Sequence, residues 1–150
     1  MRIPAYIKTS VEEWLEGFKF SGEIKVRFSE TDGFGHLNNT NAFVYFEEVR
    51  TDFFKHLGFM QKWTSLEYEA MIVVADLQCD YIKQVHFDER LTVSVKVNDI
   101  GRSSLDLHYV ALNAQNDICL IGRGTVVQIN KETGLSLAWD DDFKMLFKQA

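Results

Sequence analysis

Alternating apolar and polar residues predict several β-strands along the chain. From Glu23 to Phe28, apolar and charged residues alternate strictly, which is typical of a half-buried strand. The same alternation occurs over residues 91–98 and 105–109, whereas residues 70–75 form an apolar, β-branched run typical of a fully buried strand. A last long strand is expected over about residues 118–129, and polar turn sequences separate these segments.

The longest helix is predicted between about Asn39 and Leu57, where the sequence contains neither glycine nor proline. Its apolar stripe has spacings of three and four residues and consists of Ala42, Tyr45, Phe46, Val49, Phe53 and Leu57. Phe43, Val44 and Phe54 lie off that stripe, so we expect the helix to be buried over more than one face. Gly58 follows as a natural end of the helix.

Two shorter helices are expected near the ends of the chain. Ser10, with Glu13 three residues later, has the form of a capping box, so a short helix should begin there and end near Gly17. Three consecutive aspartates from Asp140 predict another short helix, since acidic residues suit a helix N-terminus. We interpret residues 1–20 as an N-terminal flanking segment.

The predicted order is one strand, one long helix and then four strands joined mostly by short turns. Short connections require antiparallel neighbours, because parallel strands need a longer crossover connection. One helix must then pack on one antiparallel sheet, which is an α+β architecture. The chain of 150 residues has its one proline at Pro4 and no linker, so a single domain over residues 1–150 is expected.

Composition and charge narrow the classes of function. A formal charge of -6 without any basic run argues against nucleic acid as a partner. No segment has the form of a signal peptide or the roughly 18 to 20 apolar residues of a membrane span, so we expect a cytoplasmic protein. Cys79 and Cys119 lack metal-ligand spacing and are expected to be buried free thiols. Twelve Phe, five Tyr and three Trp predict a core or a subunit interface rich in rings.

The segment Glu30–Asn39 combines Thr-Asp with Gly-His-Leu-Asn-Asn immediately before the long helix. Together with further matches at 45–50, 81–89 and 100–104, it resembles the 4-hydroxybenzoyl-CoA thioesterase-like family of the hotdog superfamily, over about residues 22–135. The resemblance implies a hotdog fold, in which an antiparallel β-sheet wraps around one long central α-helix. It also implies a homodimer or homotetramer, with the acyl-CoA substrate lying across the interface of two subunits.

The resemblance also implies two catalytic positions. In that family the acid of the Thr-Asp motif is the nucleophile or general base, and a backbone N–H seven residues later polarises the thioester carbonyl; here these positions are Asp32 and Asn39. An aspartate of ordinary pKa, about 4, is ionised at neutral pH, and a helix N-terminus offers unpaired N–H groups, so no metal or cofactor is required. A tight turn at Asp32-Gly33 and helix capping by Asn38 and Asn39 are the structural alternatives.

The residues predicted to bind substrate are His36, Asn38, Glu47, Lys83, Arg102 and Arg123. Lys83, Arg102 and Arg123 suit the phosphates of CoA if the strands that hold them flank the groove, and solvated surface charge is the alternative. For Glu47 the alternative is an ion pair with Arg50, three residues along the helix. For His36 the alternatives are a hydrogen bond to substrate, support of its loop and proton transfer.

Three functional hypotheses follow. The first is hydrolysis of an acyl-CoA; the second is hydrolysis of an acyl thioester on an acyl carrier protein, which would call for a basic docking patch that the net charge of -6 disfavours. The third is a non-catalytic hotdog protein that binds an acyl thioester. The sequence has no Gly-x-Ser-x-Gly elbow, phosphate-binding loop of the Walker type or His-Glu-x-x-His, so serine hydrolases, P-loop nucleotide enzymes and zinc peptidases are not indicated.

Overall fold

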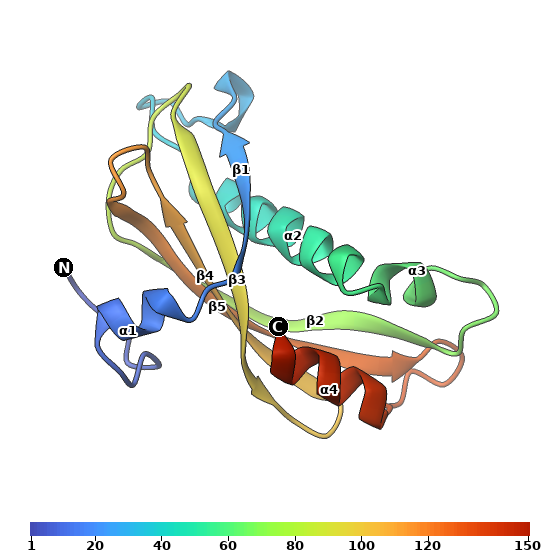
Figure 1. Ribbon diagram of the computed structural model, residues 1–150. Coiled ribbons are helices and arrows are strands. Elements are labelled where there is room, and N and C mark those ends of the chain that lie inside the picture. Colours follow the sequence, from blue (N-terminus) through green and yellow to red (C-terminus); the bar gives the residue numbers. More distant parts are fainter.

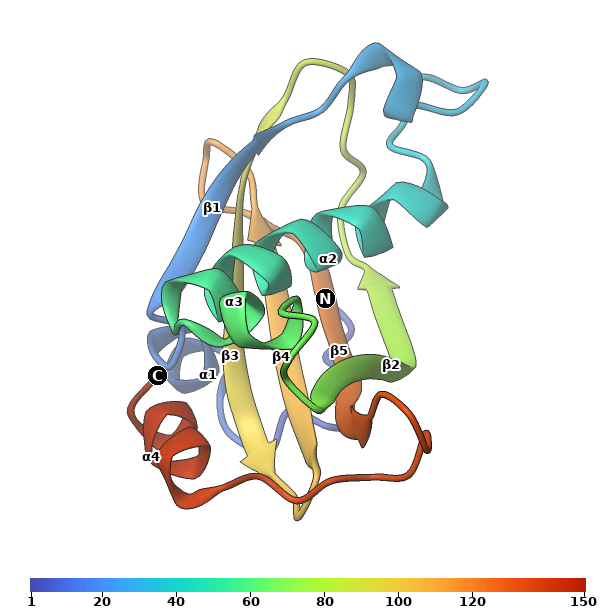
Figure 2. The same cartoon turned by 90° about the vertical axis from the view of Figure 1, so that its right-hand side faces the viewer.

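Five antiparallel strands form one sheet in the computed structural model, which describes all residues 1–150. The strands are β1 (Phe20–Lys25), β2 (Ala70–Tyr81), β3 (Arg90–Ile100), β4 (Ser104–Leu112) and β5 (Ile118–Asn130), in the spatial order β1-β3-β4-β5-β2. Helix α2 (Asn39–His56) crosses one face of the sheet, and α1 (Val11–Glu16) lies against the other (Figure 1, Figure 2). The predicted α+β arrangement of one long helix on one antiparallel sheet is therefore confirmed.

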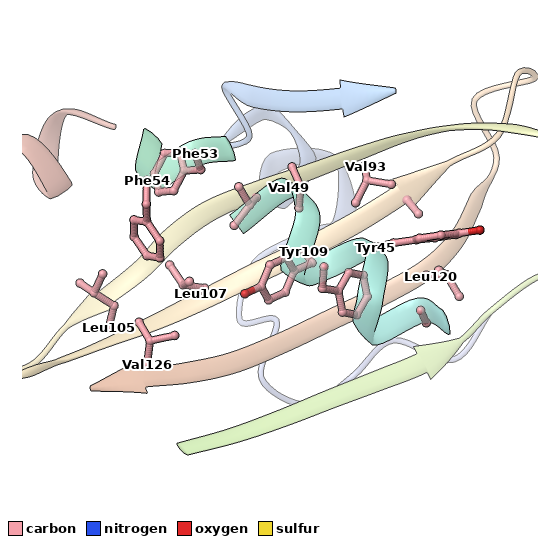
Figure 3. Close-up of a cluster of buried hydrophobic side chains, with 14 of the residues drawn as sticks. Tyr45, Val49, Phe53, Phe54, Val93, Leu105, Leu107, Tyr109, Leu120 and Val126 are labelled. Atoms are coloured by element: carbon pink, nitrogen blue, oxygen red, sulfur yellow. The ribbon is translucent and has the colours of Figure 1, made fainter. Parts of the chain in front are cut away.

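The buried stripe of α2 packs on the inner faces of β3, β4 and β5 (Figure 3). The ring of Phe46, fully buried, stacks on Tyr109 of β4 with centroids 4.6 Å apart. A Cβ at Gly122 of β5 would collide with the Phe46 ring, so glycine at this position lets the helix approach the sheet closely. Gly58, with φ of 87°, ends α2 as predicted, because this backbone conformation favours glycine.

The first strand differs from the alternation pattern. It begins earlier, at Phe20, and ends at Lys25, while Phe28 lies in a short 3-10 turn, η1 (Phe28–Glu30), with 76% of its surface exposed. The Glu30 carboxylate accepts a hydrogen bond from the N–H of Arg27 at 2.9 Å and turns the chain away from the sheet. The prediction that Phe28 lies on the buried face was therefore wrong.

The apolar run at residues 70–75 is not a fully buried strand, and that prediction was also wrong. The run opens β2, which is an edge strand that pairs only with β5. Of its first six residues only Ala70 is buried, and Met71 and Val74 are exposed. An apolar, β-branched edge with unpaired backbone groups is a surface on which another strand can pair.

Aromatic residues near the chain's end complete the core. Helix α4 (Asp141–Gln149) begins at Asp140, whose side chain accepts from the N–H of Phe143 at 2.8 Å, in agreement with the predicted helix. Its buried rings meet those of α3 (Phe59–Trp63), a helix that the pattern did not predict. The resulting cluster, called here the aromatic cluster, consists of Phe54, Phe59, Trp63, Trp139, Phe143 and Phe147.

The N-terminal segment covers part of the sheet face opposite α2. Ser10 caps α1 by accepting from the N–H of Glu13 at 3.1 Å, as predicted, and the buried Trp14 donates its indole N–H to Nδ1 of His108 at 2.9 Å. Cys119 is buried and Cys79 partly buried, and neither forms a disulfide. None of the helices has the length and apolar character that a membrane crossing would require.

Candidate active site

The segment that precedes α2 is a hydrogen-bonded turn rather than a free loop. The N–H of Asp32 donates to the carbonyl of His36 at 2.8 Å, and the N–H of Leu37 donates to the carbonyl of Val85, in the loop after β2, at 2.7 Å. Gly35 has a φ of 81°, so a residue without a side chain is favoured where the chain reverses. Residues 32–39 together form what we call the helix mouth.

The two carboxylate oxygens of Asp32 differ in their hydrogen bonding. One oxygen, Oδ1, accepts hydrogen bonds from the N–H groups of Phe34 at 2.8 Å and His36 at 3.2 Å. The hydrogen bond from Phe34, followed by the one from His36, holds the pKa of Asp32 below its ordinary value, so the group is ionised at neutral pH. The other oxygen has no hydrogen-bond partner in the chain. Asp32 is therefore a turn residue that still presents one free anionic oxygen.

The first turn of α2 supplies a free donor. Asn38 is the N-cap, and its side-chain oxygen accepts from the N–H of Thr40 at 3.1 Å. The N–H of Asn39 has no acceptor within the chain, as expected for one of the first four N–H groups of a helix. The carbonyl of Asn39 accepts a hydrogen bond from the phenol of Tyr81, at the end of β2, with a length of 2.6 Å.

One cavity adjoins the helix mouth, and a second cavity adjoins the first. The smaller, of about 210 Å³, is lined by His36, Leu37, Tyr81, Ile82, Lys83, Gln84, Val85 and Leu120. A wider cavity of about 530 Å³ shares Lys83 and Gln84 with it and extends toward Arg90. An apolar niche that meets a polar, more open hollow suits a ligand with an apolar end and a charged end.

The family model described as the thioesterase-like superfamily matches residues 26–147. The chain belongs to the thioesterase-like superfamily. Two predictions from the sequence are thereby confirmed, namely the resemblance to thioesterases of this kind and the hotdog fold.

Individual relatives agree with the family. The uncharacterized protein YsmA of Bacillus subtilis is 44% identical over 144 residues, which cover 96% of this chain and 95% of that protein. The structure of a predicted thioesterase from Bacillus stearothermophilus has a TM-score of 0.77 and 30% identity, over 87% of this chain and 94% of that chain. A thioesterase from Thermus thermophilus, solved with coenzyme A and zinc, has a TM-score of 0.75 and 25% identity, over 89% of this chain and 95% of that chain.

In this thioesterase-like chain, His36 belongs to the helix mouth and Lys83 lies beside it. The His36 ring packs edge to face on His86 with centroids 5.0 Å apart, and the two residues form an isolated β-bridge, which favours a supporting role for His36. Lys83 is exposed and forms an ion pair with Asp117 at 2.6 Å, and the hydrogen bond that its ammonium donates to that carboxylate raises the pKa of Lys83. No group of three or more His, Cys, Asp or Glu side chains is placed to hold a metal ion.

Glu47 lies away from Asp32, in a different groove of about 740 Å³ between β1 and α2. Six acidic residues line that groove, against two basic ones: Glu23, Glu30, Glu47, Glu48, Asp52 and Asp88. The carboxylate of Glu47 is 4.0 Å from the guanidinium of the buried Arg50, which agrees with the ion-pair alternative. This groove is therefore electrostatically unsuited to an anionic ligand such as CoA.

The other two basic residues are remote from the helix mouth within one chain. Arg102 lies in the turn between β3 and β4, at the end of the sheet opposite the helix mouth, and its carbonyl accepts from the N–H of Trp139. Arg123 lies on the sheet face opposite α2, where its guanidinium binds Asp106 at 2.7 Å and Asp76 at 3.3 Å. The strands that hold them do not flank a common groove with Lys83, contrary to expectation, and their contact with CoA stays a prediction.

Sequence reasoning missed Tyr81 as a site residue. Its position lies within the segment at 81–89 that matched the family, but a tyrosine at the end of a strand carries no local signal for a contact 42 residues away. The contact depends on how β2 ends beside the first turn of α2, which is visible in Figure 2.

Proposed function

We propose that this chain hydrolyses the thioester of an acyl-CoA, with Asp32 as general base or nucleophile and the N–H of Asn39 as oxyanion donor. One observation carries the proposal: a free, ionised oxygen of Asp32 and an unpartnered helix N–H occur in the same hydrogen-bonded segment. Acyl transfer needs these two elements, an activated nucleophile and a donor for the charge on the carbonyl oxygen.

The reaction balances with water as the only co-substrate. In the general-base route, Asp32 takes a proton from water while the water oxygen bonds to the carbonyl carbon; the carbon–sulfur bond then breaks, and the proton goes to the thiolate of CoA. In the nucleophilic route, an oxygen of Asp32 bonds to the carbonyl carbon, and the carbon–sulfur bond breaks to release CoA as its thiolate. Water then hydrolyses the resulting anhydride, which returns the Asp32 carboxylate, releases the acid and supplies the proton that the thiolate takes up. Both routes place negative charge on the carbonyl oxygen, where one donor contributes roughly 3 kcal/mol.

CoA is the favoured carrier of the acyl group for two reasons. A thioesterase of the same fold, from Thermus thermophilus, was solved with coenzyme A. Beside the helix mouth, Lys83 is a cation at the edge of both adjoining cavities and can meet a phosphate. An acidic carrier protein would instead face a chain of net charge -6.

The test is thiol release from a panel of short, aromatic and long acyl-CoAs, with wild type and Asp32→Asn. We expect release with at least one acyl class and its loss in the variant. Absence of release with every substrate, or full turnover by Asp32→Asn, would refute the assignment. Tight binding without turnover, measured by calorimetry on the same panel, would instead identify a non-catalytic acyl-thioester-binding protein.

The proposal includes assembly of at least two copies along β2. The free edge of β2 is apolar, with Met71, Val74 and Tyr81 exposed, and its unpaired backbone groups can extend the sheet into a second copy. Light scattering after size exclusion should give twice or four times the mass of 17.4 kDa. Val74→Lys should shift the mass toward the monomer, because a charge on this edge opposes strand pairing. A wild-type monomer at micromolar concentration would exclude this assembly.

A further inference from the structure

Tyr81 connects the free edge of the sheet to the helix mouth. Its phenol donates to the carbonyl of Asn39 over 2.6 Å, and no other side chain of the sheet forms a hydrogen bond with residues 38–41. The last residue of β2 is thus bonded to the first residue of α2. Figure 2 shows the end of β2 pointing toward the first turn of this helix.

This contact fixes the residue whose N–H is free. On its N-terminal side Asn39 follows the N-cap Asn38, whose carbonyl accepts from Asn41 at 2.9 Å. On its C-terminal side its own carbonyl is bound by Tyr81. Helix ends otherwise fray, so a first-turn N–H without such contacts has no defined direction. The two contacts together hold Asn39 from both sides and leave its N–H pointing away from them.

Tyr81 is chemically suited to this role over a wide pH range. Partial desolvation of this half-exposed phenol, aided by the neighbouring Cys79, raises the pKa of Tyr81 to about 12. The phenol therefore keeps its proton throughout the range in which thioester hydrolysis is measured. A carbonyl oxygen can only accept, so a protonated phenol is the partner that this position needs.

We propose that Tyr81 is a positioning residue for hydrolysis, which holds Asn39 so that its N–H meets the oxyanion. The inference rests on the proposed function and adds a residue to it. Tyr81 does not touch the reacting atoms in this assignment. A small displacement of a donor costs much more in rate than in substrate affinity, because the donor acts on charge that develops in the transition state.

The experiment compares Tyr81→Phe with wild type and with Tyr68→Phe as the matched control. Tyr68 lies just before the opposite end of β2, and its hydroxyl forms no hydrogen bond within the chain. We expect Tyr81→Phe to lower kcat about 10-fold, as the loss of one hydrogen bond allows, with KM changed less than about 2-fold. Tyr68→Phe should retain wild-type kcat, and both variants should melt within about 2 °C of wild type.

A pH profile separates positioning of the donor from an effect on Asp32. The acid limb of kcat, set by Asp32, should be the same in Tyr81→Phe as in wild type, while the plateau is lower. An unchanged plateau, a displaced acid limb, or a loss matched by a fall in melting temperature would each overturn the inference. A wild type without thiol release would refute the proposed function itself and the inference with it, whereas an active wild type with a fully active Tyr81→Phe refutes the inference alone.

Discussion

The two ends of α2 differ in what holds them. At its N-terminus, the helix mouth is polar and partly exposed, and hydrogen bonds such as those from Leu37 to Val85 and from Tyr81 to Asn39 fix it in place. At its C-terminus, α2 runs into the aromatic cluster, where Phe54 is fully buried and meets Trp63 edge to face with centroids 5.1 Å apart. Ring packing supplies the larger free energy, while the hydrogen-bonded end keeps a carboxylate oxygen and an N–H available for chemistry.

This difference predicts which substitutions should affect stability and which should affect turnover. A residue of the helix mouth contributes little buried area, so its replacement should leave the fold intact. A ring of the aromatic cluster is almost completely buried, so its replacement should lower the amount of folded protein and leave the turnover of each folded molecule unchanged.

The largest expected effect is that of Asp32→Asn on turnover. Loss of the general base or nucleophile should lower kcat by about 10²- to 10⁴-fold. The amide oxygen can still accept from Phe34 and His36, so the melting temperature should move by less than about 2 °C. The matched control is Asp99→Asn, since Asp99, near the end of β3, also accepts a hydrogen bond from a backbone N–H, that of Ile100. Equal losses of turnover in both variants would contradict the special role of the helix mouth.

Phe143→Ala should show the opposite behaviour. Removal of this fully buried ring leaves a cavity among Phe59, Trp139 and Phe147 and should destabilise the fold by about 3 to 5 kcal/mol. For a chain of this size we expect the melting temperature to fall by about 10 °C. Phe34→Ala is the control, because this ring of the helix mouth is 86% exposed, and it should change the melting temperature little. A larger fall in melting temperature for Phe34→Ala than for Phe143→Ala would contradict the stated difference between the two ends of α2.

The pattern of the sequence predicted α2 and its caps because those signals are local. Helical spacing, Asn38 before the first turn and Gly58 after the last one are all encoded within the helix and its neighbours. The edge position of β2 is not local, since the run that opens it suits a central strand equally well and only the pairing order decides. The turn at Asp32 was accessible to sequence reasoning because the two N–H groups that bind its Oδ1 belong to residues two and four positions away.

Residues that depend on register were harder to place. Arg123 stands opposite His108 in the β4–β5 ladder, on the face away from α2, whereas one residue earlier it would face the helix. Tyr81 reaches the helix mouth only because β2 ends beside it. In both cases the deciding quantity is how two distant segments align, and the residue type carries no information on that.

Acid should destabilise the fold through a group remote from the helix mouth. His108 is buried on the face opposite α2 and accepts from Trp14, and it is surrounded by Asp106, Lys96 and Arg123. Burial, partly opposed by Asp106, lowers the pKa of His108 to about 4 from an ordinary value of 6.5. Between these two pH values the unfolded chain binds more protons, so stability is full above about pH 6.5 and falls as the pH drops toward 4, by on the order of 3 kcal/mol.

The variant His108→Gln checks this expectation. The Gln side-chain oxygen can accept from Trp14 without titrating, so the free energy of unfolding should vary less between pH 6.5 and 4 than in wild type. Asp32 stays ionised over the upper part of this window because its pKa lies below the ordinary value. Turnover per folded molecule should therefore remain constant there, as single-turnover assays corrected for the folded fraction would show. An equal pH slope in both proteins would contradict the assignment to His108.

The smallest expected effect concerns the basic residues. Lys83 lies beside the helix mouth and Arg102 at the opposite end of the sheet, so Lys83→Ala should raise KM for acyl-CoA about 3-fold with kcat unchanged, and Arg102→Ala should leave both constants unchanged. The rise should shrink in high salt, because a surface charge that meets a phosphate is screened. The reverse result, in which Arg102→Ala raises KM and Lys83→Ala does not, would indicate that Arg102 of a second copy completes the site. The two ends of the sheet would then act together across a subunit interface rather than within one chain.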